Sequence, residues 1–207
     1  MAGSETARPA RLIPTQQRSR ERFERILASA AELLVEKGSE DFRMSDVVAR
    51  SGVPFGSLYQ YFPDKTAIIG TLAERYDGIG RACVESELAA VDTAADLKPA
   101  LCRVVDGYYR MFAEAPVMHD IWQATQADRA LQAQDAAEGL RLAGLMADTM
   151  RRIDPGMEFG ALMTVSRLIM TLIAATVRDA ITLPPDDAAR SIALFKQMLP
   201  DDLFRLI

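Results

Sequence analysis

The sequence has few of the residues that build metal sites, disulfides or nucleophilic catalytic centres. Its 207 residues include one histidine, His119, and two cysteines, Cys83 and Cys102. The cysteines lack the close spacing of a zinc site, and His119 has no metal-ligand partner in phase on its own helix. No GxxxxGK phosphate loop is present. We therefore expect no enzyme activity, no bound metal and no cofactor.

The sequence also lacks a segment that would direct it out of the cytoplasm. Residues 1–20 contain no apolar run of the kind found in signal peptides. A chain with 49% hydrophobic and 26% charged residues builds a core without disulfides, so we expect reduced, buried thiols in the cytoplasm. Residues 159–177 are long and apolar enough for a membrane-spanning helix. Insertion of the central Arg167 into a bilayer would be unfavourable by about 2.5–3.5 kcal/mol. We expect this helix to be covered by protein and expect no membrane partner.

Charge is distributed unevenly along the chain. The net charge is −5, yet residues 8–25 hold six arginines against two glutamates. Residues 66–207 hold 14 basic and 20 acidic side chains. A cationic segment on an acidic molecule indicates a localised anionic partner, and a solvated flexible tail is the alternative.

Apolar periodicity predicts helix along nearly the whole chain, and no long β-alternating run appears. A single stripe in the first helix contains Phe23, Ile26, Leu27, Ala30 and Leu34, and Gly38 is placed to end that helix. Further helices are predicted over residues 44–51 and 55–62, from Asp64 onward, and over about 95–113, 116–127, 128–152, 156–181 and 185–199. The fold class is therefore all-α.

Two short helices joined by a tight turn at Gly52-Val53-Pro54 form a helix-turn-helix pattern. Gly52 permits a turn that a Cβ would obstruct. Val53 is an apolar plug for packing the turn against the first helix, and Pro54 suits the start of the next helix. We expect a DNA-reading element at this place.

The helical wheel of residues 55–62 separates two faces. It predicts that Leu58 and Phe62 lie in the core. The opposite face is small, polar and uncharged and consists of Gly56, Ser57, Gln60 and Tyr61. Such a face suits a major groove, where base edges pair with amides and hydroxyls. The wheel leaves two places open for Phe55, the core or a thymine methyl.

Residues 18–66 resemble the DNA-binding domain of the TetR-type transcriptional regulators. The matching residues are Gly38, Asp46, Val47, Gly52, Val53, Gly56, Ser57, Leu58, Tyr59, Tyr61, Phe62 and Lys65. The resemblance implies an N-terminal three-helix helix-turn-helix DNA-binding domain over residues 18–65. A flexible basic arm over residues 1–17 would precede it, and a C-terminal helical ligand-binding and dimerisation domain would occupy residues 66–207.

The resemblance also implies a set of DNA contacts. These are Arg18, Arg20, Arg43, Ser45, Phe55, Gly56, Ser57, Tyr59, Gln60, Tyr61 and Lys65. Tyr59 and Gln60 are expected to reach bases or phosphates, and Tyr61 and Lys65 to hold the DNA backbone. Arg43 departs from the family, which commonly has Thr or Ser here as a helix cap. We expect loss of that cap, which costs about 1 kcal/mol, with a phosphate contact from the guanidinium in its place.

The C-terminal part contains many methionines and aromatics, which suit a surface that must adapt to more than one shape. The family resemblance implies a ligand cavity there. The candidate lining residues are Tyr109, Phe112, Met118, Trp122, Met146, Met163 and Arg167. Ordinary core packing is the alternative for each of them.

The last two long helices, about residues 156–199, are apolar enough to need a partner. In the family the corresponding helices pair in a homodimer. The resemblance thus implies a homodimeric repressor that binds a palindromic operator in double-stranded DNA and is released by a small apolar or amphipathic effector. The alternatives are an architectural or partner-recruiting DNA-binding protein without an effector, and an enzyme with an accessory helix-turn-helix.

Overall fold

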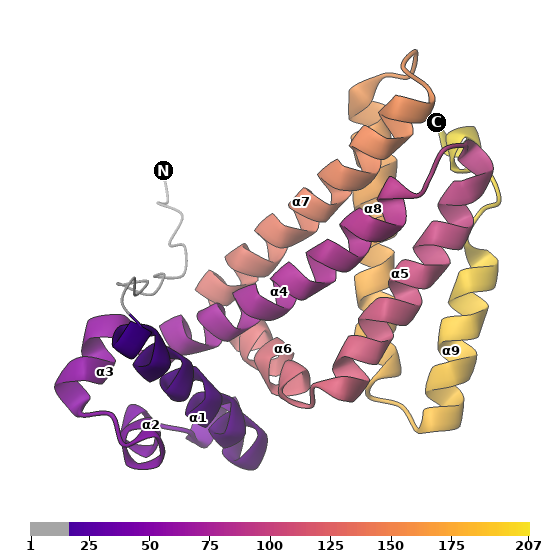
Figure 1. Cartoon of the computed structure of the whole chain (residues 1–207). Coiled ribbons are helices and arrows are strands. Elements are labelled where there is room, and N and C mark those ends of the chain that lie inside the picture. Colours follow the sequence, from indigo (N-terminus) through magenta and orange to yellow (C-terminus); the bar gives the residue numbers. More distant parts are fainter. Residues whose placement is uncertain (1–16) are drawn as a thin grey trace. The chain divides into compact units, whose positions relative to one another are not determined.

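A computed structural model describes residues 17–207, and every element in this range is a helix (Figure 1). The elements are α1 (Gln17–Asp41), α2 (Met44–Ser51), α3 (Phe55–Tyr61), α4 (Lys65–Ala89), α5 (Ala94–Glu114), α6 (Val117–Ala127), α7 (Arg129–Ile153), α8 (Phe159–Ala180), α9 (Pro185–Met198) and the short 3₁₀ helix η1 (Leu203–Leu206). The all-α prediction is confirmed, and each predicted helix is present close to its predicted bounds. Of the expected flexible arm, residues 1–16 lie outside the described residues, and Gln17 already belongs to α1.

The described chain divides into two compact units. Unit 1 comprises residues 17–77 and 115–136, and unit 2 comprises residues 78–114 and 137–207. Unit 1 thus holds α1 to α3, the first half of α4, all of α6 and the start of α7. The functional boundary that we expect at residue 65 stays a prediction.

The apolar stripe of α1 forms the centre of unit 1. Its predicted members Phe23, Ile26, Leu27, Ala30 and Leu34 are all buried. They pack with Val47 of α2, with Leu58 of α3 and Phe62 directly after it, and with Ile68 of α4 in one hydrophobic cluster. Because the stripe repeats with the helical period, one face of α1 supplies the apolar contacts with α2 and α3.

Gly38 interrupts α1 before its last turn. Its φ of 75° and ψ of 170° are non-helical, and the positive φ favours a residue without a Cβ. The helix predicted to end at Gly38 therefore does so, and a further short helical turn follows up to Asp41. This turn places the buried ring of Phe42 and the carbonyls of Ser39 and Glu40 beside α4.

In unit 1, α6 packs against α1, although the two helices are far apart in the sequence. Val117, Ile121 and Ala124 recur at i, i+4 and i+7 on α6, and all three are buried in the same cluster as the α1 stripe. The core that supports the helix-turn-helix thus includes a helix outside residues 18–65.

Unit 2 is built on contacts among α5, α8, α9 and η1 (Figure 1). Lys196 of α9 pairs with Asp106 of α5 at 2.7 Å, and Arg81 donates to both carboxylate oxygens of Glu138 at 2.7 and 3.0 Å. Cys83 and Cys102 are unpaired and half-buried, rather than buried as expected.

The most apolar helix, α8, is long and apolar enough to cross a membrane by length and composition alone. Its most apolar window has a mean hydropathy of 1.7, and 39% of that window is buried. The centre contains Arg167, which is exposed, as are Leu168 and Leu172. A core helix of a soluble protein has the same length and apolar composition. In α8, Leu162, Ile169 and Ile173 are buried and contribute to the core.

Candidate nucleic-acid interface

The turn between α2 and α3 has the conformation that its sequence predicts. Gly52 is left-handed, with φ 65° and ψ 14°, and its N–H donates to the Val48 carbonyl at 3.0 Å. Val53 is 1% exposed and packs in the core as the expected plug. Pro54 precedes α3, and its carbonyl accepts from the N–H groups of Ser57 and Leu58. The turn fixes the angle between α2 and α3.

The buried face of α3 differs in part from the helical-wheel prediction. Leu58 and Phe62 are fully buried, as predicted. The expected outward position of Tyr61 is wrong, because this residue is 6% exposed. Tyr61 and Phe55 each lie about 60° from Leu58 on the wheel, on opposite sides of it, so the wheel does not separate them. Tyr61 is buried because its side of α3 meets α1.

The side of α3 that carries Phe55 and Tyr59 is exposed. Phe55 is 50% exposed and Tyr59 is 43% exposed. Their rings stack on each other at 6.2 Å between centroids, with an interplanar angle of 13°. Phe55 therefore lies on the surface, and the choice between core and surface for this residue is resolved.

The rest of the outward face of α3 is small and polar. Gly56 and Gln60 are exposed, and Ser57 is half-buried. A Cβ added to Gly56 would meet no atom within 4 Å, so packing inside the chain does not require glycine there. The absence of a side chain at this position instead leaves room for a molecule that approaches from outside.

Tyr61 links α3 to the beginning of α1. Its hydroxyl shares a hydrogen bond of 2.7 Å with the hydroxyl of Ser19, and its ring packs edge-on against Phe23 at 5.8 Å. Phe23 also stacks on Phe62 at 5.0 Å. Sequence reasoning missed Ser19, since no local pattern connects two residues so far apart in the chain.

At the start of α2, Arg43 occupies the cap position without capping the helix. A guanidinium has no acceptor for the helix N–H groups, so the predicted loss of a side-chain cap is confirmed. Asp46 compensates in part, since its carboxylate accepts from the Arg43 N–H at 3.0 Å and pairs with Lys37 at 3.1 Å. The hydrogen bond from Lys37, and next the one from the Arg43 backbone, hold the pKa of Asp46 below its usual 3.8.

Lys65 has partners inside the chain. Its ammonium group donates to the carbonyls of Ser39 and Glu40 at 2.9 and 3.1 Å and lies 5.9 Å above the ring of Phe42. These carbonyls follow the break at Gly38, so Lys65 ties the last turn of α1 to the start of α4. The expected contact to the DNA backbone stays a prediction.

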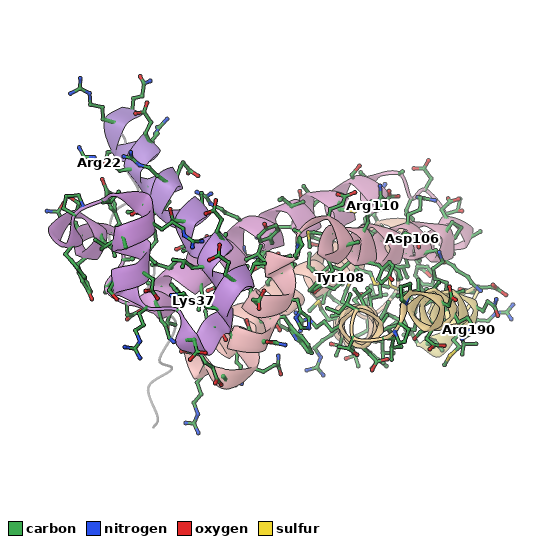
Figure 2. All side chains as sticks on the ribbon, turned by 90° about the horizontal axis from the view of Figure 1, so that it is seen from below. Arg22, Lys37, Asp106, Tyr108, Arg110 and Arg190 are labelled. Atoms are coloured by element: carbon green, nitrogen blue, oxygen red, sulfur yellow. The ribbon has the colours of Figure 1, made fainter. Side chains whose placement is uncertain are left out.

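Basic side chains line α1 and flank α2. Arg18, Arg20 and Arg43 are exposed, and so is Ser45 on α2. Figure 2 shows Arg22 near the start of α1 and Lys37 toward its end. Arg50, by contrast, donates to both carboxylate oxygens of Glu36 at 2.7 and 2.5 Å, so its charge is paired within the protein.

The residues expected to line an effector site are divided between the two units. Met118 and Trp122 of α6 belong to unit 1, whereas Tyr109 and Phe112 of α5, Met146 of α7, and Met163 and Arg167 of α8 belong to unit 2. Phe112 and Met118 are buried, and Met146 is fully buried. Arg167 is exposed on α8. Their contact with an effector stays a prediction.

Trp122 has the one buried side-chain nitrogen or oxygen in residues 17–207 for which no hydrogen-bond partner is found. Its indole Nε1 is shielded from solvent, and the ring lies 6.3 Å from the ring of His119. An unpaired buried N–H is unfavourable by about 1–3 kcal/mol. A hydrogen-bond acceptor at this nitrogen would therefore be favoured.

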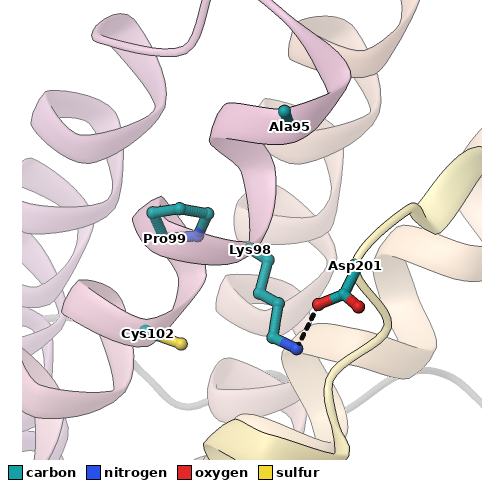
Figure 3. A pocket seen from close by; sticks show the side chains of 5 residues that line it. All are labelled: Ala95, Lys98, Pro99, Cys102 and Asp201. Atoms are coloured by element: carbon teal, nitrogen blue, oxygen red, sulfur yellow. Dashed lines mark hydrogen bonds and ion pairs between the residues drawn. The ribbon is translucent and has the colours of Figure 1, made fainter.

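An open hollow of about 380 Å³ on unit 2 is a separate feature. Its lining is Ala95, Lys98, Pro99, Cys102 and Asp201 (Figure 3). Lys98 and Asp201 pair across it at 2.6 Å. None of the predicted effector-binding residues lines this hollow. Within residues 17–207, no group of three or more His, Cys, Asp or Glu side chains is placed to hold a metal ion.

Two family profiles match the chain. The family described as "Bacterial regulatory proteins, tetR family" matches residues 26–72, which contain the helix-turn-helix. A family described as "Tetracyclin repressor-like, C-terminal domain" matches residues 95–207. A sequence relative from Bacillus subtilis, the uncharacterized HTH-type transcriptional regulator YvdT, is 40% identical over 53 residues. This match spans 26% of the chain and about a quarter, 27%, of the relative's length.

Solved structures with the same fold support the profile matches. A TetR-family transcriptional regulator from Streptomyces coelicolor is 24% identical, with a TM-score of 0.66 over 90% of this chain and 99% of that one. The multidrug binding protein EbrR, complexed with imidazole, is 23% identical, with a TM-score of 0.65 over 91% and 98% of the two chains. SmeT, in a complex with triclosan, is 17% identical, with a TM-score of 0.65 over 86% and 89%. At these identities the likeness establishes the fold.

Proposed function

Since the chain belongs to the TetR family of bacterial transcriptional regulators, we propose that it is a homodimeric repressor released from its operator by a small apolar or amphipathic effector. The observation that carries this proposal is the outward face of α3. Leu58 and Phe62 anchor the helix from behind, while Gly56, Ser57 and Gln60 lie on the other side. A helix held in this way presents hydrogen-bonding groups to a major groove.

The basic side chains around this face supply affinity without sequence preference. Arg18, Arg20 and Arg43 are exposed, and each would bind a phosphate beside the groove. Ser45 donates a further hydrogen bond to a phosphate or base. Each phosphate neutralised by a basic side chain contributes about 0.9 to the dependence of log K on log salt concentration.

The homodimer forms through α8 and α9. Exposed apolar side chains recur at i and i+4 on both helices, Leu168 and Leu172 on α8 and Leu194 and Met198 on α9. Exposed apolar side chains that gather on one surface mark an interaction site. Two copies related by a two-fold axis read a palindrome whose half-sites lie about one helical turn apart.

The effector is a small apolar or amphipathic compound, and Trp122 of α6 is the proposed contact residue. Trp122 supports this proposal, because its buried Nε1 lacks a partner and favours a ligand that carries a hydrogen-bond acceptor. The solved complexes of EbrR with imidazole and of SmeT with triclosan support it too, since both proteins share this fold. The effector favours a state that does not match DNA, so DNA and effector weaken each other's binding by the same factor.

The DNA-binding part of the proposal is tested by selection of duplexes from a random-sequence pool, followed by gel-shift titration of the enriched duplex. We expect a palindromic site and a protein dimer on each duplex. Leu168→Arg should reduce dimerisation in sedimentation and weaken operator binding. Leu140→Arg on α7 is the matched control, because Leu140 is similarly exposed outside the proposed interface.

The effector part is tested with the only tryptophan, Trp122, as an intrinsic fluorescent reporter. A panel of small apolar compounds that includes triclosan and imidazole, together with cell extract, is titrated into the protein and into its complex with DNA. We expect at least one addition to shift the tryptophan emission and release the DNA. If neither the panel nor the extract loosens the complex, the protein is an architectural or partner-recruiting DNA-binding protein without an effector.

A further inference from the structure

The stacked pair Phe55 and Tyr59, here called the aromatic ledge, is an exception among the aromatic side chains of unit 1. The rings of Phe23, Phe42, Tyr61 and Phe62 are buried and Tyr76 and Trp122 are half-buried, whereas the two residues of the ledge are exposed, at 50% and 43%. The two residues are one helical turn apart on α3, and their rings are nearly parallel at 6.2 Å. The ledge is therefore a continuous apolar surface on the outward side of the recognition helix.

Packing within the chain does not explain the ledge. The core-facing positions of α3 are filled by Leu58, Tyr61 and Phe62. Phe55 and Tyr59 cover only part of each other, and the area that stays in water is unfavourable until another surface covers it. Because each ring is held by its neighbour, little side-chain freedom is lost when such a surface arrives.

The neighbours of the ledge indicate what covers it. Gly56 offers space for close approach, and Gln60 and Ser57 offer hydrogen bonds beside an apolar contact. A major groove has one apolar group on its base edges, the 5-methyl group of thymine. Cytosine, adenine and guanine present polar atoms there, which an aromatic surface does not satisfy.

We propose that the aromatic ledge reads thymine methyl groups, with Phe55 and Tyr59 contacting at least one thymine in each half-site of the operator. This inference rests on the proposed DNA-binding function and adds to it a base and a pair of residues that select that base. Gln60, next to the ledge, would form a hydrogen bond with a base edge. The phenol oxygen of Tyr59 is not needed for the contact with the thymine methyl group.

The test replaces thymine by deoxyuridine, which removes only the methyl group. In the duplex enriched from the random pool, each dT is changed to dU in turn, and the dissociation constant is measured by fluorescence anisotropy. We expect wild-type protein to lose about fourfold in affinity at one or more symmetry-related dT positions, the effect of burying one methyl-sized apolar group. Phe55→Ala should bind the dT duplex about fourfold more weakly than wild type does. It should bind the dU duplex as tightly as it binds the dT duplex.

Two controls separate the ring from other contributions. Tyr59→Phe keeps the ring and removes the hydroxyl, so it should retain the sensitivity to dU, whereas Tyr59→Ala should lose it. Val35→Ala removes an equally exposed apolar side chain from α1 and should leave both duplexes bound as by wild type. Thermal melting of each variant confirms that the half-exposed substitutions leave the fold intact.

Several outcomes overturn the inference. It is wrong if no dT→dU change weakens wild-type binding, or if the sensitivity persists in both Phe55→Ala and Tyr59→Ala. It is also wrong if Phe55→Ala changes self-association and leaves DNA affinity unchanged, because the ledge is then a protein contact. If no duplex is enriched from the random pool, the proposed DNA-binding function itself fails, and the inference fails with it.

Discussion

Tyr61 and Ser19 share a hydroxyl–hydroxyl hydrogen bond of 2.7 Å that joins the end of α3 to the start of α1 across 42 residues. The ring of Tyr61 is buried against Phe23, so the residue supports the recognition helix from the core side. A residue expected on the DNA-facing surface is thus part of the scaffold that sets the position of that surface.

Removing the hydroxyl of Tyr61 should destabilise the fold slightly. We expect Tyr61→Phe to lower the free energy of unfolding by about 1 kcal/mol, because the Ser19 hydroxyl loses its partner while the ring stays packed. Tyr61→Ala should lower it by about 3–5 kcal/mol, as for other large buried rings. Urea denaturation measures both values. In a double-mutant cycle with Ser19→Ala, a coupling energy near zero would contradict the bond.

Adding a methyl group to Gly56 should affect DNA binding and spare the fold. We expect Gly56→Ala to keep or raise stability by up to about 1 kcal/mol, since alanine favours helix and no atom blocks its Cβ. The same methyl group would intrude where DNA approaches, so operator affinity should fall at least about fivefold. Gly139→Ala, which also adds an unobstructed Cβ to a helix, is the control, with unchanged affinity in gel shifts.

Lys65 should contribute to stability and to phosphate binding. Lys65→Met keeps the aliphatic stem and removes two hydrogen bonds to the Ser39 and Glu40 carbonyls, so unfolding should require about 1–3 kcal/mol less. If the third ammonium proton binds a phosphate, the slope of log K against log salt concentration should fall by about 0.9. If the variant has the same slope as wild type, Lys65 does not bind a phosphate and its role is structural.

The stability contribution of Asp46 should depend on pH. Its pKa is lowered in the folded protein by the Lys37 and Arg43 hydrogen bonds, so the folded state favours the charged carboxylate. This contribution is complete above the usual pKa of 3.8 and is lost as pH falls through the lower folded pKa. Asp46→Asn should therefore melt at a lower temperature than wild type at pH 7, and the difference should shrink as pH falls below 3.8 and the carboxylate takes up its proton. A constant difference across this range would contradict the assignment.

Gly107 of α5 marks a close approach to Cys83 of α4 in unit 2. A Cβ on Gly107 would lie 2.8 Å from the Cys83 sulfur, so we expect Gly107→Ala to destabilise the protein by about 1 kcal/mol. In a Cys83→Ala background the same change should instead stabilise by about 0.5–1 kcal/mol through helix propensity. Gly144→Ala, with open space at its Cβ, should stabilise in either background. Calorimetry of the five variants measures the change of sign.

Much of the helix-turn-helix could be predicted, because its signals are local. The stripe on α1, the left-handed Gly52 and the anchoring Leu58 each follow from spacing within a few residues. The direction of the buried arc on α3 could not be predicted with the same certainty. A seven-residue helix with aromatic residues on several sides has no single apolar stripe, and the wheel alone does not say which rings meet α1.

The sequence by itself determined the helices, their breaks and the family, because helix periodicity, glycine and proline act over one or two turns of chain. The tertiary structure alone decided that Tyr61 is buried while Phe55 and Tyr59 are exposed. It also decided that Lys65 binds the carbonyls behind Gly38 and that α6 packs on α1. The physical reason is the same in each case: burial and hydrogen bonding depend on which distant segment covers a side chain, and residues 25 or 42 positions apart leave no local pattern of their pairing.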